Sequence, residues 1–475
     1  MPHTVLRIDH ISGVERFPVI GPSYIRNAVF KCRNAPATFK DQHRRLVGDG
    51  SMPYHFLVAS WAAPGDLGPM LTGARQLRDR GHDVRFIARS DAREQVEAAQ
   101  FGFASWRRTP SFSPVGNTAD GNPMRYAYDN FLFGPAAARA ADTRDEFDSA
   151  PTDVLIAHDC LFGCAMAAEA VGMPCALLSP HISMRPLPGM PPLGSGMRAP
   201  RTPEERAEVE AANSRYAAVM NEWLPMLNEA RASQGLAPLD DVIELYDRPA
   251  RLLLAISAAF DFKADYLPGN VRYIGPLLDT SIWSRSWVAP WRHGPDRPRA
   301  LISFSTVFKD QADALQRTLN AVAGIDMEAV ATVGALKDET FRASKNVTLL
   351  PSAPHDAVMK EVSLVVTHGG HGTVSRALFH GLPLLVMSRG PETNDNAARV
   401  EAHGAGLALP SAASEMEIAA ALNRLIREPH FRAAARRLGH MIADEVKSAP
   451  LVGEMEEIAG ASNVGASNVA YLEGL

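Results

Sequence analysis

The chain has 475 residues, a formal net charge of −5 at pH 7 and 46% hydrophobic residues. This length predicts two or three domains with sizeable cores. The acidic balance, with no basic run interleaved with aromatics, argues against a nucleic-acid partner. No apolar stretch reaches about 18 residues and no apolar segment follows Met1, so we expect neither membrane insertion nor a secretion signal.

The first 51 residues are polar and weakly periodic. They are interpreted either as an N-terminal extension or as sequence ahead of a start at Met52. An α/β pattern then begins, with a strand over 55–59, a loop that places Pro69 at the first position of a helix, and a strand over 83–88.

The same logic recurs over 153–178, as strand, helix and strand. A segment rich in Pro, Gly and Arg follows at 184–205, which predicts either a mobile flap over a cleft or a plain surface connection. Residues 204–234 are predicted to be helical. After a tryptophan-containing linker, the second half alternates strand and helix from 300 to 403, which is typical of parallel sheets covered on both faces.

The four cysteines are Cys32, Cys160, Cys164 and Cys175, and none forms a CxxC pair. Cys160 and Cys164 fit one helix face, but two thiols alone make a poor metal site. We therefore expect buried free thiols, which suits a reducing cytosol and predicts a cytoplasmic location.

The segment Thr367–Thr373 reads THGGHGT and lies between an apolar strand pattern and a helical one. A glycine-rich turn from a strand into a helix directs backbone N–H groups towards an anion. The glycines alone are also explained by a tight turn, but the two histidines are not. The expected guest is a phosphate or diphosphate, although the spacing fits neither a P-loop nor a dinucleotide fingerprint.

The wider segment from 367 to 406 resembles the donor signature of the UDP-glycosyltransferase superfamily, in particular its bacterial macrolide and antibiotic-tailoring branch. Residues 267–276 and 302–307 resemble the entry and first strand of the family's second domain, and Gly65–Pro69 is similar to its GHxxP or GDxxP loop. The resemblance implies the GT-B fold, two Rossmann-like parallel-sheet domains facing across a cleft. The expected plan is an extension (1–51), an acceptor domain (52–276), a linker (277–298), a donor domain (299–455) and a disordered tail (456–475).

The resemblance also implies a donor site. His368 and Thr373 match positions that bind the diphosphate, assisted by backbone N–H groups around Gly370 and Gly372. The ring of His371 is a further hydrogen-bond donor in the same turn. Thr306 matches another phosphate contact. Pro354 and His355 match the base-binding segment, although His355 also fits a helix cap.

Two departures bear on the donor. The position where relatives with a ribose donor often carry a Glu is Arg376, which favours a dTDP-sugar over a UDP-sugar because deoxyribose lacks the 2′-hydroxyl. Many relatives carry an Asp-Gln pair that binds the sugar hydroxyls, and the matching positions here are Glu392 and Thr393. The shorter reach of Thr suits a modified sugar.

The resemblance places the catalytic base in the first domain. The position usually held by His is Asp66, and the later position usually held by its Asp partner reads His158. Either Asp66 is the base, or His158 is the base and Asp66 orients it. A turn role for Asp66 and a strand-end cap for His158 remain open.

We thus predict an inverting glycosyltransferase that moves a sugar from a nucleotide-diphosphate sugar to a hydrophobic small-molecule acceptor, with no metal and no further cofactor. Two alternatives are a catalytically silent nucleotide-sugar-binding partner of another transferase and a nucleotide-sugar 2-epimerase. A homodimer is left open.

Overall fold

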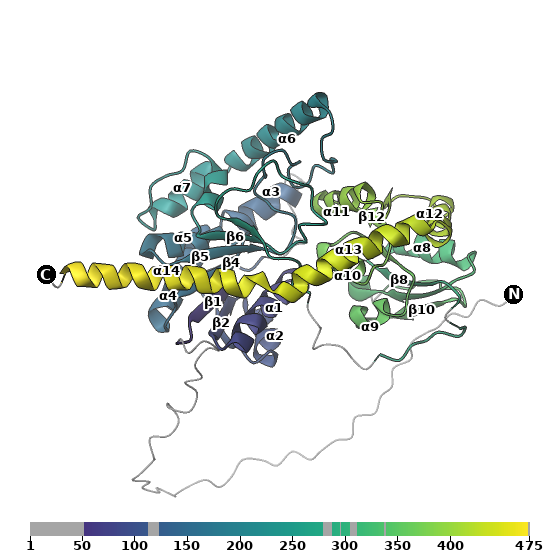
Figure 1. Ribbon diagram of the computed structural model, residues 1–475, viewed down its shortest axis with the longest axis horizontal. Coiled ribbons are helices and arrows are strands. Elements are labelled where there is room, and N and C mark those ends of the chain that lie inside the picture. The colour runs from purple at the N-terminus through teal and green to yellow at the C-terminus, as the bar shows by residue number, and fades with distance from the viewer. Residues whose placement is uncertain are drawn as a thin grey trace, which may run out of the picture.

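The computed structural model describes residues 52–112, 123–278, 287–294, 296–304, 311–336 and 339–473. The extension 1–51, Cys32 and Thr306 lie outside these residues. Within them, the first domain is built on a seven-stranded sheet in the order β3-β2-β1-β4-β5-β6-β7, with every pairing parallel (Figure 1). Its strands are β1 (His55–Ala59), β2 (Asp83–Ala88), β3 (Gly102–Ser105), β4 (Val154–His158), β5 (Cys175–Ser179), β6 (Arg251–Leu254) and β7 (Val271–Tyr273).

Helices flank this sheet. They are α1 (Pro64–Arg80), α2 (Arg93–Ala98), α3 (Pro123–Ala127), α4 (Ala136–Ser149), α5 (Phe162–Val171), α6 (Pro203–Asn221) and α7 (Leu224–Ala232).

Two helix predictions are corrected. Helix α1 begins at Pro64 rather than at Pro69, which lies inside it, because Pro64 already takes the first helical position. The single helix expected over 204–234 is divided between α6 and α7. Pro225 lacks the N–H that would continue the hydrogen-bond ladder, so a new helix starts beside it.

The second domain is built on a six-stranded parallel sheet, in the order β10-β9-β8-β11-β12-β13 among the described residues. Its strands are β8 (Arg299–Ser303), β9 (Glu328–Thr332), β10 (Val347–Leu350), β11 (Leu364–Thr367), β12 (Leu384–Ser388) and β13 (Gly406–Pro410). Its helices are α8 (Ala312–Ala323), α9 (His355–Met359), α10 (His371–Phe379), α11 (Pro391–Ala402), α12 (Glu415–Arg427) and α13 (Pro429–Ser448).

The central strands of both sheets are buried, as their near-continuous apolar sequences require. In each, the strand order reverses beside its central strand, between β1 and β4 and between β8 and β11. Ligands of open parallel sheets bind outside the carboxyl ends of the strands at such a reversal. The fold therefore provides two crevices, one in each domain.

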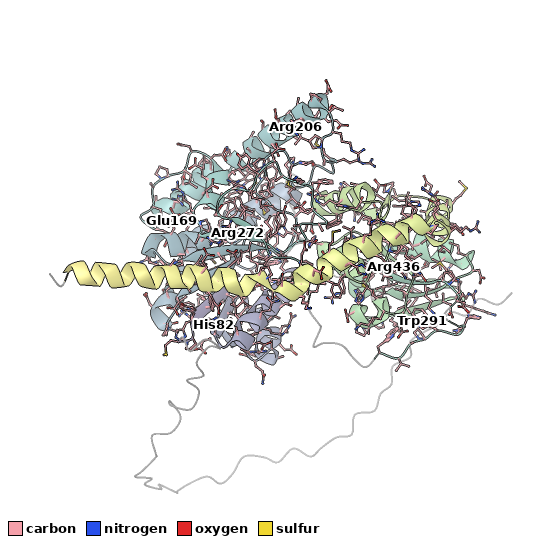
Figure 2. The ribbon with its side chains drawn as sticks, viewed as in Figure 1. His82, Glu169, Arg206, Arg272, Trp291 and Arg436 are labelled. Atoms are coloured by element: carbon pink, nitrogen blue, oxygen red, sulfur yellow. The ribbon has the colours of Figure 1, made fainter. Side chains whose placement is uncertain are left out.

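The predicted disordered tail is wrong. The chain forms helix α14 (Pro450–Glu473), which runs across the first domain while α13 lies on the second (Figure 1). Leu451, Met455 and Ile458 recur at helical spacing and pack into the core of the first domain. Glu456 also lies 3.2 Å from the buried His82, which is labelled in Figure 2. These apolar positions lie before the repeated Gly-Ala-Ser-Asn-Val sequence, on which the prediction of disorder rested.

A buried ion pair joins the domains. Arg399 of α11 donates to Asp261 at 2.8 Å, and both side chains are almost fully buried. Tyr273 donates to the other oxygen of the same carboxylate at 2.8 Å. Removing one partner of such a pair leaves an uncompensated buried charge, so this contact fixes how the domains meet.

The proline-rich segment 184–205 reaches the second domain. The backbone N–H groups of Gly194 and Gly196 donate to the two oxygens of Asp395, at 2.5 and 2.7 Å. Arg198 pairs with Glu401 at 3.1 Å. Of the two interpretations left open by the sequence, these cross-domain contacts favour a flap.

On the linker, Trp287 and Trp291 both donate to the carboxylate of Glu361 in the second domain, and Trp291 is labelled in Figure 2. Within the described residues, every helix is too short or too polar to span a bilayer.

Candidate active site

The predicted catalytic pair meets at the reversal point of the first sheet. Asp66 lies in the first turn of α1, directly after β1, and His158 is the last residue of the neighbouring strand β4. The Nε2 atom of His158 lies 3.2 Å from Oδ1 of Asp66. Parallel pairing of β1 with β4 brings the two together although 92 residues separate them.

The two members differ in exposure. The Asp66 side chain is 26% exposed and that of His158 is 2% exposed. Asp66 therefore faces solvent, and His158 lies behind it. The alternative structural roles also have support. Asp66 N–H donates to the Ala63 carbonyl in the turn that begins α1, and His158 Nδ1 accepts from Cys160 N–H at the end of β4.

Three further residues surround His158, and none of them was among the predicted site residues. Asp159 follows it, Cys160 comes next, and His181 follows the adjacent strand β5. Oδ1 of Asp159 lies 3.2 Å from His158 Nδ1 and 3.2 Å from His181 Nε2. The pattern His-Asp-Cys at a strand end was the available signal, but His181 required the strand order.

Charges within this group shift its pKa values. Burial lowers the pKa of His158, but the Cys160 sulfur and the carboxylates of Asp159 and Asp66 outweigh it, and the pKa lies well above its usual value. The pKa of His181 is raised in the same way by Asp159. Burial raises the pKa of Asp159, but the two imidazoles outweigh burial and hold that pKa far below its usual range.

Cys160, Cys164 and Cys175 are buried free thiols, as predicted. Cys164 contacts Thr143 at 3.3 Å and does not act together with Cys160, which lies before α5.

In the second domain, the glycine-rich turn joins β11 to α10 as predicted. Gly369 has φ of 98°, and a Cβ there would lie 2.8 Å from Val386 and 3.1 Å from the carbonyl oxygen of Thr393. Glycine is therefore required at 369, a position outside the predicted set. Gly370 is the N-cap of α10, and the exposed Gly372 lies in its first turn. The positive end of α10 thus opens at this turn.

His368 is a neutral, under-used side chain. Its Nδ1 atom is buried and has no hydrogen-bond partner. Burial lowers its pKa to about 4, although the Ser303 carbonyl opposes the shift. A Cβ at Gly370 would lie 2.8 Å from its Nε2 atom, so the glycine makes room for this ring.

His371, in contrast, is engaged by the protein. Its Nδ1 lies 3.3 Å from Asn396 Oδ1, and its Nε2 lies 3.1 Å from Ser375 Oγ. The ring of His371 is therefore not available to contact the donor. His371 contributes only its backbone N–H at the start of α10. Thr373 is half-buried one turn into the same helix.

The predicted base-binding segment begins α9. Pro354 occupies the N-cap position and His355 the first helical position, so His355 does not cap the helix. Its Nε2 lies 3.5 Å from the hydroxyl of Thr332. Burial and the charge of Arg376 lower its pKa to about 4. Arg376 itself lies 3.7 Å from Asp356.

The predicted sugar-reading pair begins α11. The hydroxyl of Thr393 donates to Gly390 O and accepts from Arg389 N, both at 3.0 Å. Its only donor is thereby used within its own loop, so towards a sugar it retains one acceptor. Asn396, absent from the predicted set, ties α11 to the turn by donating to Gly369 O at 2.9 Å.

Glu392 connects the two halves of the site. Burial raises the pKa of its carboxyl group; the positive charge of His181 opposes that rise and the negative charge of Asp66 adds to it. Two side chains of the first domain thus act on a side chain of the donor signature. The charges of the first domain therefore reach the donor signature of the second.

An aromatic cluster stands next to the Asp66 loop. Trp61, which follows β1, contacts Phe131 and Phe112 with ring centroids 4.3 and 5.5 Å apart. Phe112 stacks on Tyr126 at 5.7 Å. The cluster presents flat apolar surface at the carboxyl edge of the first sheet.

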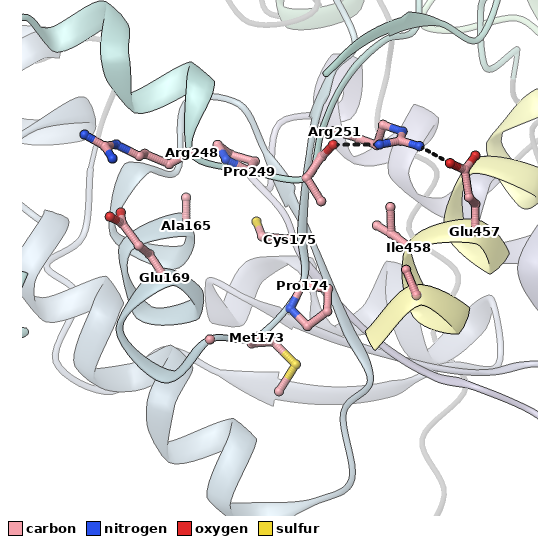
Figure 3. A pocket seen from close by; sticks show the side chains of 13 residues that line it. Ala165, Glu169, Met173, Pro174, Cys175, Arg248, Pro249, Arg251, Glu457 and Ile458 are labelled. Atoms are coloured by element: carbon pink, nitrogen blue, oxygen red, sulfur yellow. Dashed lines mark hydrogen bonds and ion pairs between the residues drawn. The ribbon is translucent and has the colours of Figure 1, made fainter. Parts of the chain in front are cut away.

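The 570 Å³ cavity of Figure 3 lies elsewhere. It is lined by the amino ends of β5 and β6 at Cys175 and Arg251, and by Glu457 and Ile458 of α14. Asp66 and His158 lie at the carboxyl edge of the same sheet, so this cavity is separate from the catalytic pair.

Comparisons with known proteins agree with this geometry. Residues 316–458 match the family model of the erythromycin biosynthesis protein CIII-like C-terminal domain. The chain is 28% identical over 409 residues to 4'-demethylrebeccamycin synthase of Lentzea aerocolonigenes, covering 80% of this chain and 94% of that protein. It is 35% identical over 178 residues to aklavinone 7-beta-L-rhodosaminyltransferase of Streptomyces galilaeus, covering 36% of this chain and 40% of that one.

Among solved structures, the glycosyltransferase VinC in complex with dTDP has the same fold. Its TM-score is 0.62 at 19% identity, and the match covers 86% of this chain and 100% of that chain.

The two parallel sheets match the GT-B fold of solved structures, which confirms the predicted fold. The sequence relatives are named glycosyltransferases, which confirms the predicted enzyme class. More particularly, the chain carries an EryCIII-like C-terminal domain, and its homologues are antibiotic-tailoring glycosyltransferases.

Proposed function

We propose that the protein transfers a sugar, with inversion, from a dTDP-sugar to a hydrophobic small-molecule acceptor held by the first domain. The observation that carries the proposal is the contact between Asp66 and His158, whose atoms lie 3.2 Å apart at the strand reversal of the first sheet. Glu392 of the second domain would read the sugar hydroxyls. A base beside the anomeric carbon and an acceptor for sugar hydroxyls are the two groups that such a transfer needs at one place.

The diphosphate would bind at the start of α10. Backbone N–H groups and the helix dipole favour a dianion there without a metal ion. The Nδ1 of His368 has no partner, and it would donate to the diphosphate in the tautomer in which the other ring nitrogen gives up its hydrogen bond to the Ser303 carbonyl. A neutral imidazole binds the leaving group through this hydrogen bond, and the N–H groups stabilise the charge that develops on it.

The deoxyribose preference rests on Arg376. Its guanidinium lies beside the carboxylate of Asp356, which holds it next to the base-binding segment. A guanidinium has no acceptor for the hydroxyls of a ribose. We therefore expect dTDP to bind more tightly than UDP, and the dTDP complex of a protein with the same fold is consistent with this choice.

Asp66 is the preferred base. It is the exposed member of the pair, whereas His158 has almost no access to a substrate. Asp66 would accept the proton of the attacking hydroxyl, and His158 would position its carboxylate. The acceptor would lie against Trp61 and the aromatic cluster, because flat apolar side chains favour a planar or polycyclic molecule.

Calorimetry with dTDP, UDP, GDP and ADP tests the donor site first. Selective dTDP binding is expected, followed by turnover of dTDP-sugars with polycyclic acceptors and a product of inverted anomeric configuration. A preference for UDP would overturn the donor assignment alone. Binding without turnover across acceptors would favour the silent partner, and no nucleotide binding would remove the proposal.

A further inference from the structure

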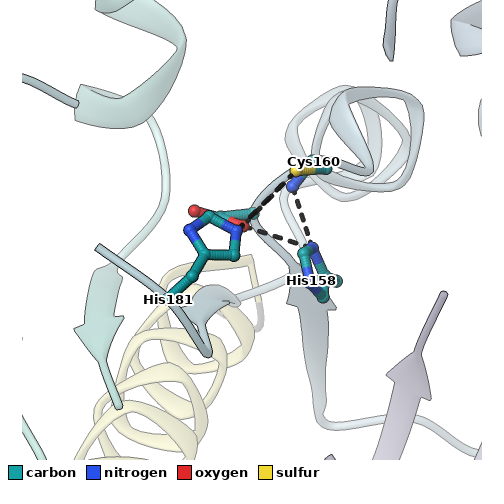
Figure 4. Close-up of side chains that lie close together, drawn as sticks. His158, Cys160 and His181 are labelled. Atoms are coloured by element: carbon teal, nitrogen blue, oxygen red, sulfur yellow. Dashed lines mark hydrogen bonds and ion pairs between the residues drawn. The ribbon is translucent and has the colours of Figure 1, made fainter. Parts of the chain in front are cut away.

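Four potential metal ligands converge behind Asp66. They are Nδ1 of His158, Oδ1 of Asp159, Sγ of Cys160 and Nε2 of His181, and all lie within 4.8 Å of one another (Figure 4). Three come from the end of β4 and one from the loop after β5, so neighbouring parallel strands hold them. Three of the residues are buried, and His181 is 14% exposed at its side chain.

The hydrogen bond of His181 fixes its protonation. Its Nδ1 lies 2.8 Å from the carbonyl oxygen of Ile182, which can only accept. Nδ1 therefore carries the proton, and in the neutral ring Nε2 presents a lone pair. That lone pair faces the carboxylate oxygen of Asp159 at 3.2 Å. Two acceptors at this distance need a cation between them or a second proton on the ring.

His158 repeats the arrangement. Its Nε2 faces the carboxylate of Asp66, which accepts a proton-bearing nitrogen. Its Nδ1 lone pair accepts from Cys160 N–H at 3.2 Å and lies 3.2 Å from Asp159 Oδ1, so an ion at this position would take the lone pair in place of that N–H. Histidine ligands of metals commonly donate their other N–H to a carboxylate or to a backbone carbonyl. Here His158 does the first and His181 the second.

Asp159 supplies a further sign. Its side chain is fully buried, and its Oδ2 atom has no hydrogen-bond partner. A buried carboxylate that is only partly satisfied is costly, and a cation at its other oxygen, Oδ1, would offset part of that cost.

We propose that these four side chains bind one zinc ion. Two imidazole nitrogens, a thiolate and a carboxylate form a donor set that suits tetrahedral zinc. Ordinary zinc–ligand bonds at tetrahedral angles would place the ligand atoms about 3.3 to 3.6 Å apart. The observed separations from Asp159 Oδ1 are 3.2, 3.2 and 3.7 Å, and Cys160 Sγ lies 4.0 Å from His181 Nε2.

Zinc binding would balance the charges of the cluster. The ion carries two positive charges, and the carboxylate and the thiolate carry two negative charges. When the ion binds, the Cys160 thiol releases its proton to solvent, and so does each of the two histidine rings that carries a second proton. The proton of His158 then remains on Nε2, which makes His158 a fixed donor to Asp66 and a positioning residue. The site therefore goes beyond the transfer reaction and does not depend on the sugar donor.

Metal content tests the proposal first. The full-length protein, purified without chelators, should contain about one zinc per chain by inductively coupled plasma mass spectrometry. Cys160→Ser and His181→Ala should each lose most of it. Cys175→Ser is the matched control, since it removes a buried thiol of the same domain outside the cluster and should retain the metal.

Cobalt substitution provides a spectroscopic test. After chelation and addition of Co²⁺ alone, the wild type and Cys175→Ser should show a thiolate-to-cobalt charge-transfer band together with intense four-coordinate bands. Cys160→Ser should lack the charge-transfer band while its far-ultraviolet circular dichroism remains that of the wild type. A folded wild-type protein with neither bound zinc nor the cobalt–thiolate band would overturn the proposal. So would an equal band in Cys160→Ser.

Discussion

Two sets of buried histidines face each other across the domain boundary, and their surroundings give them opposite chemistry. His158 and His181 in the first domain lie beside carboxylates, which raise their pKa values. His368 and His371 in the second domain lie among backbone groups, a hydroxyl and an amide, and burial lowers their pKa values to about 4. Burial alone therefore does not decide the state of a histidine; the charge of its partners does.

The histidines of the two domains therefore have different roles. In the second domain, the neutral ring of His368 would donate a hydrogen bond to a diphosphate, while the ring of His371 is held by Asn396 and Ser375. In the first domain, the rings of His158 and His181 lower the pKa of Asp159 and so hold its carboxylate in the ionised form. Each of the following experiments removes one element of this contrast.

The largest effect is expected for Asp66→Asn. The amide keeps the shape but removes the proton acceptor, so turnover should fall by roughly 10² or more. Nucleotide affinity should be unchanged, because the donor cradle lies in the other domain. The measurement is kcat with a dTDP-sugar, together with calorimetry of dTDP. Asp79→Asn, an exposed carboxylate of the same helix, is the control. Retained turnover in Asp66→Asn with loss in His158→Ala would make His158 the base.

The next largest effect is expected for the donor site at the start of α10. His368→Ala combined with Thr373→Ala removes two side-chain hydrogen bonds to a charged group, each worth about 1.5–3 kcal/mol. The dissociation constant of dTDP should rise by roughly a hundredfold or more in calorimetry. His440→Ala, an exposed histidine of the same domain, should bind like the wild type. An unchanged affinity in the double variant would place the diphosphate elsewhere.

Acid should weaken the second domain. A histidine with a folded-state pKa of about 4 binds fewer protons than the unfolded chain, whose histidines titrate near about 6.5. Stability from His371 is therefore complete above about pH 6.5 and is lost as the pH falls towards 4. The variant His371→Gln should show a shallower fall of Tm between pH 7 and pH 4.5. Parallel curves for variant and wild type would contradict the neutral assignment.

The smallest effect is expected at the flap. Asp395→Ala removes the acceptor of the Gly194 and Gly196 N–H groups, so amide exchange at these glycines should accelerate and KM for the donor should rise several-fold. Glu401→Ala breaks the more exposed pair with Arg198 and a hydrogen bond from Ala408 N–H inside the second domain, and it should change amide exchange in the flap little. Equal exchange in both variants would mean that Asp395 does not hold the flap.

The sequence alone determined a large part of this molecule. Apolar strands alternating with helices specified two parallel sheets, and the turn at 367–373 located the start of α10. The exchanged positions of Asp66 and His158 predicted a contact that the paired strands β1 and β4 provide. These features are local, or follow from a resemblance carried by short motifs.

Tertiary structure decided what depends on neighbours. His181 joins His158 only because β5 pairs with β4, and nothing in its own segment announces a carboxylate partner. Helix α14 is stable because the first domain buries one face of it, which a reading of the tail as a repeat missed. His371 is engaged because Asn396 approaches from α11. Hydrogen bonds and charges act over a few ångströms in space, whereas the pattern of a sequence records only what lies along the chain.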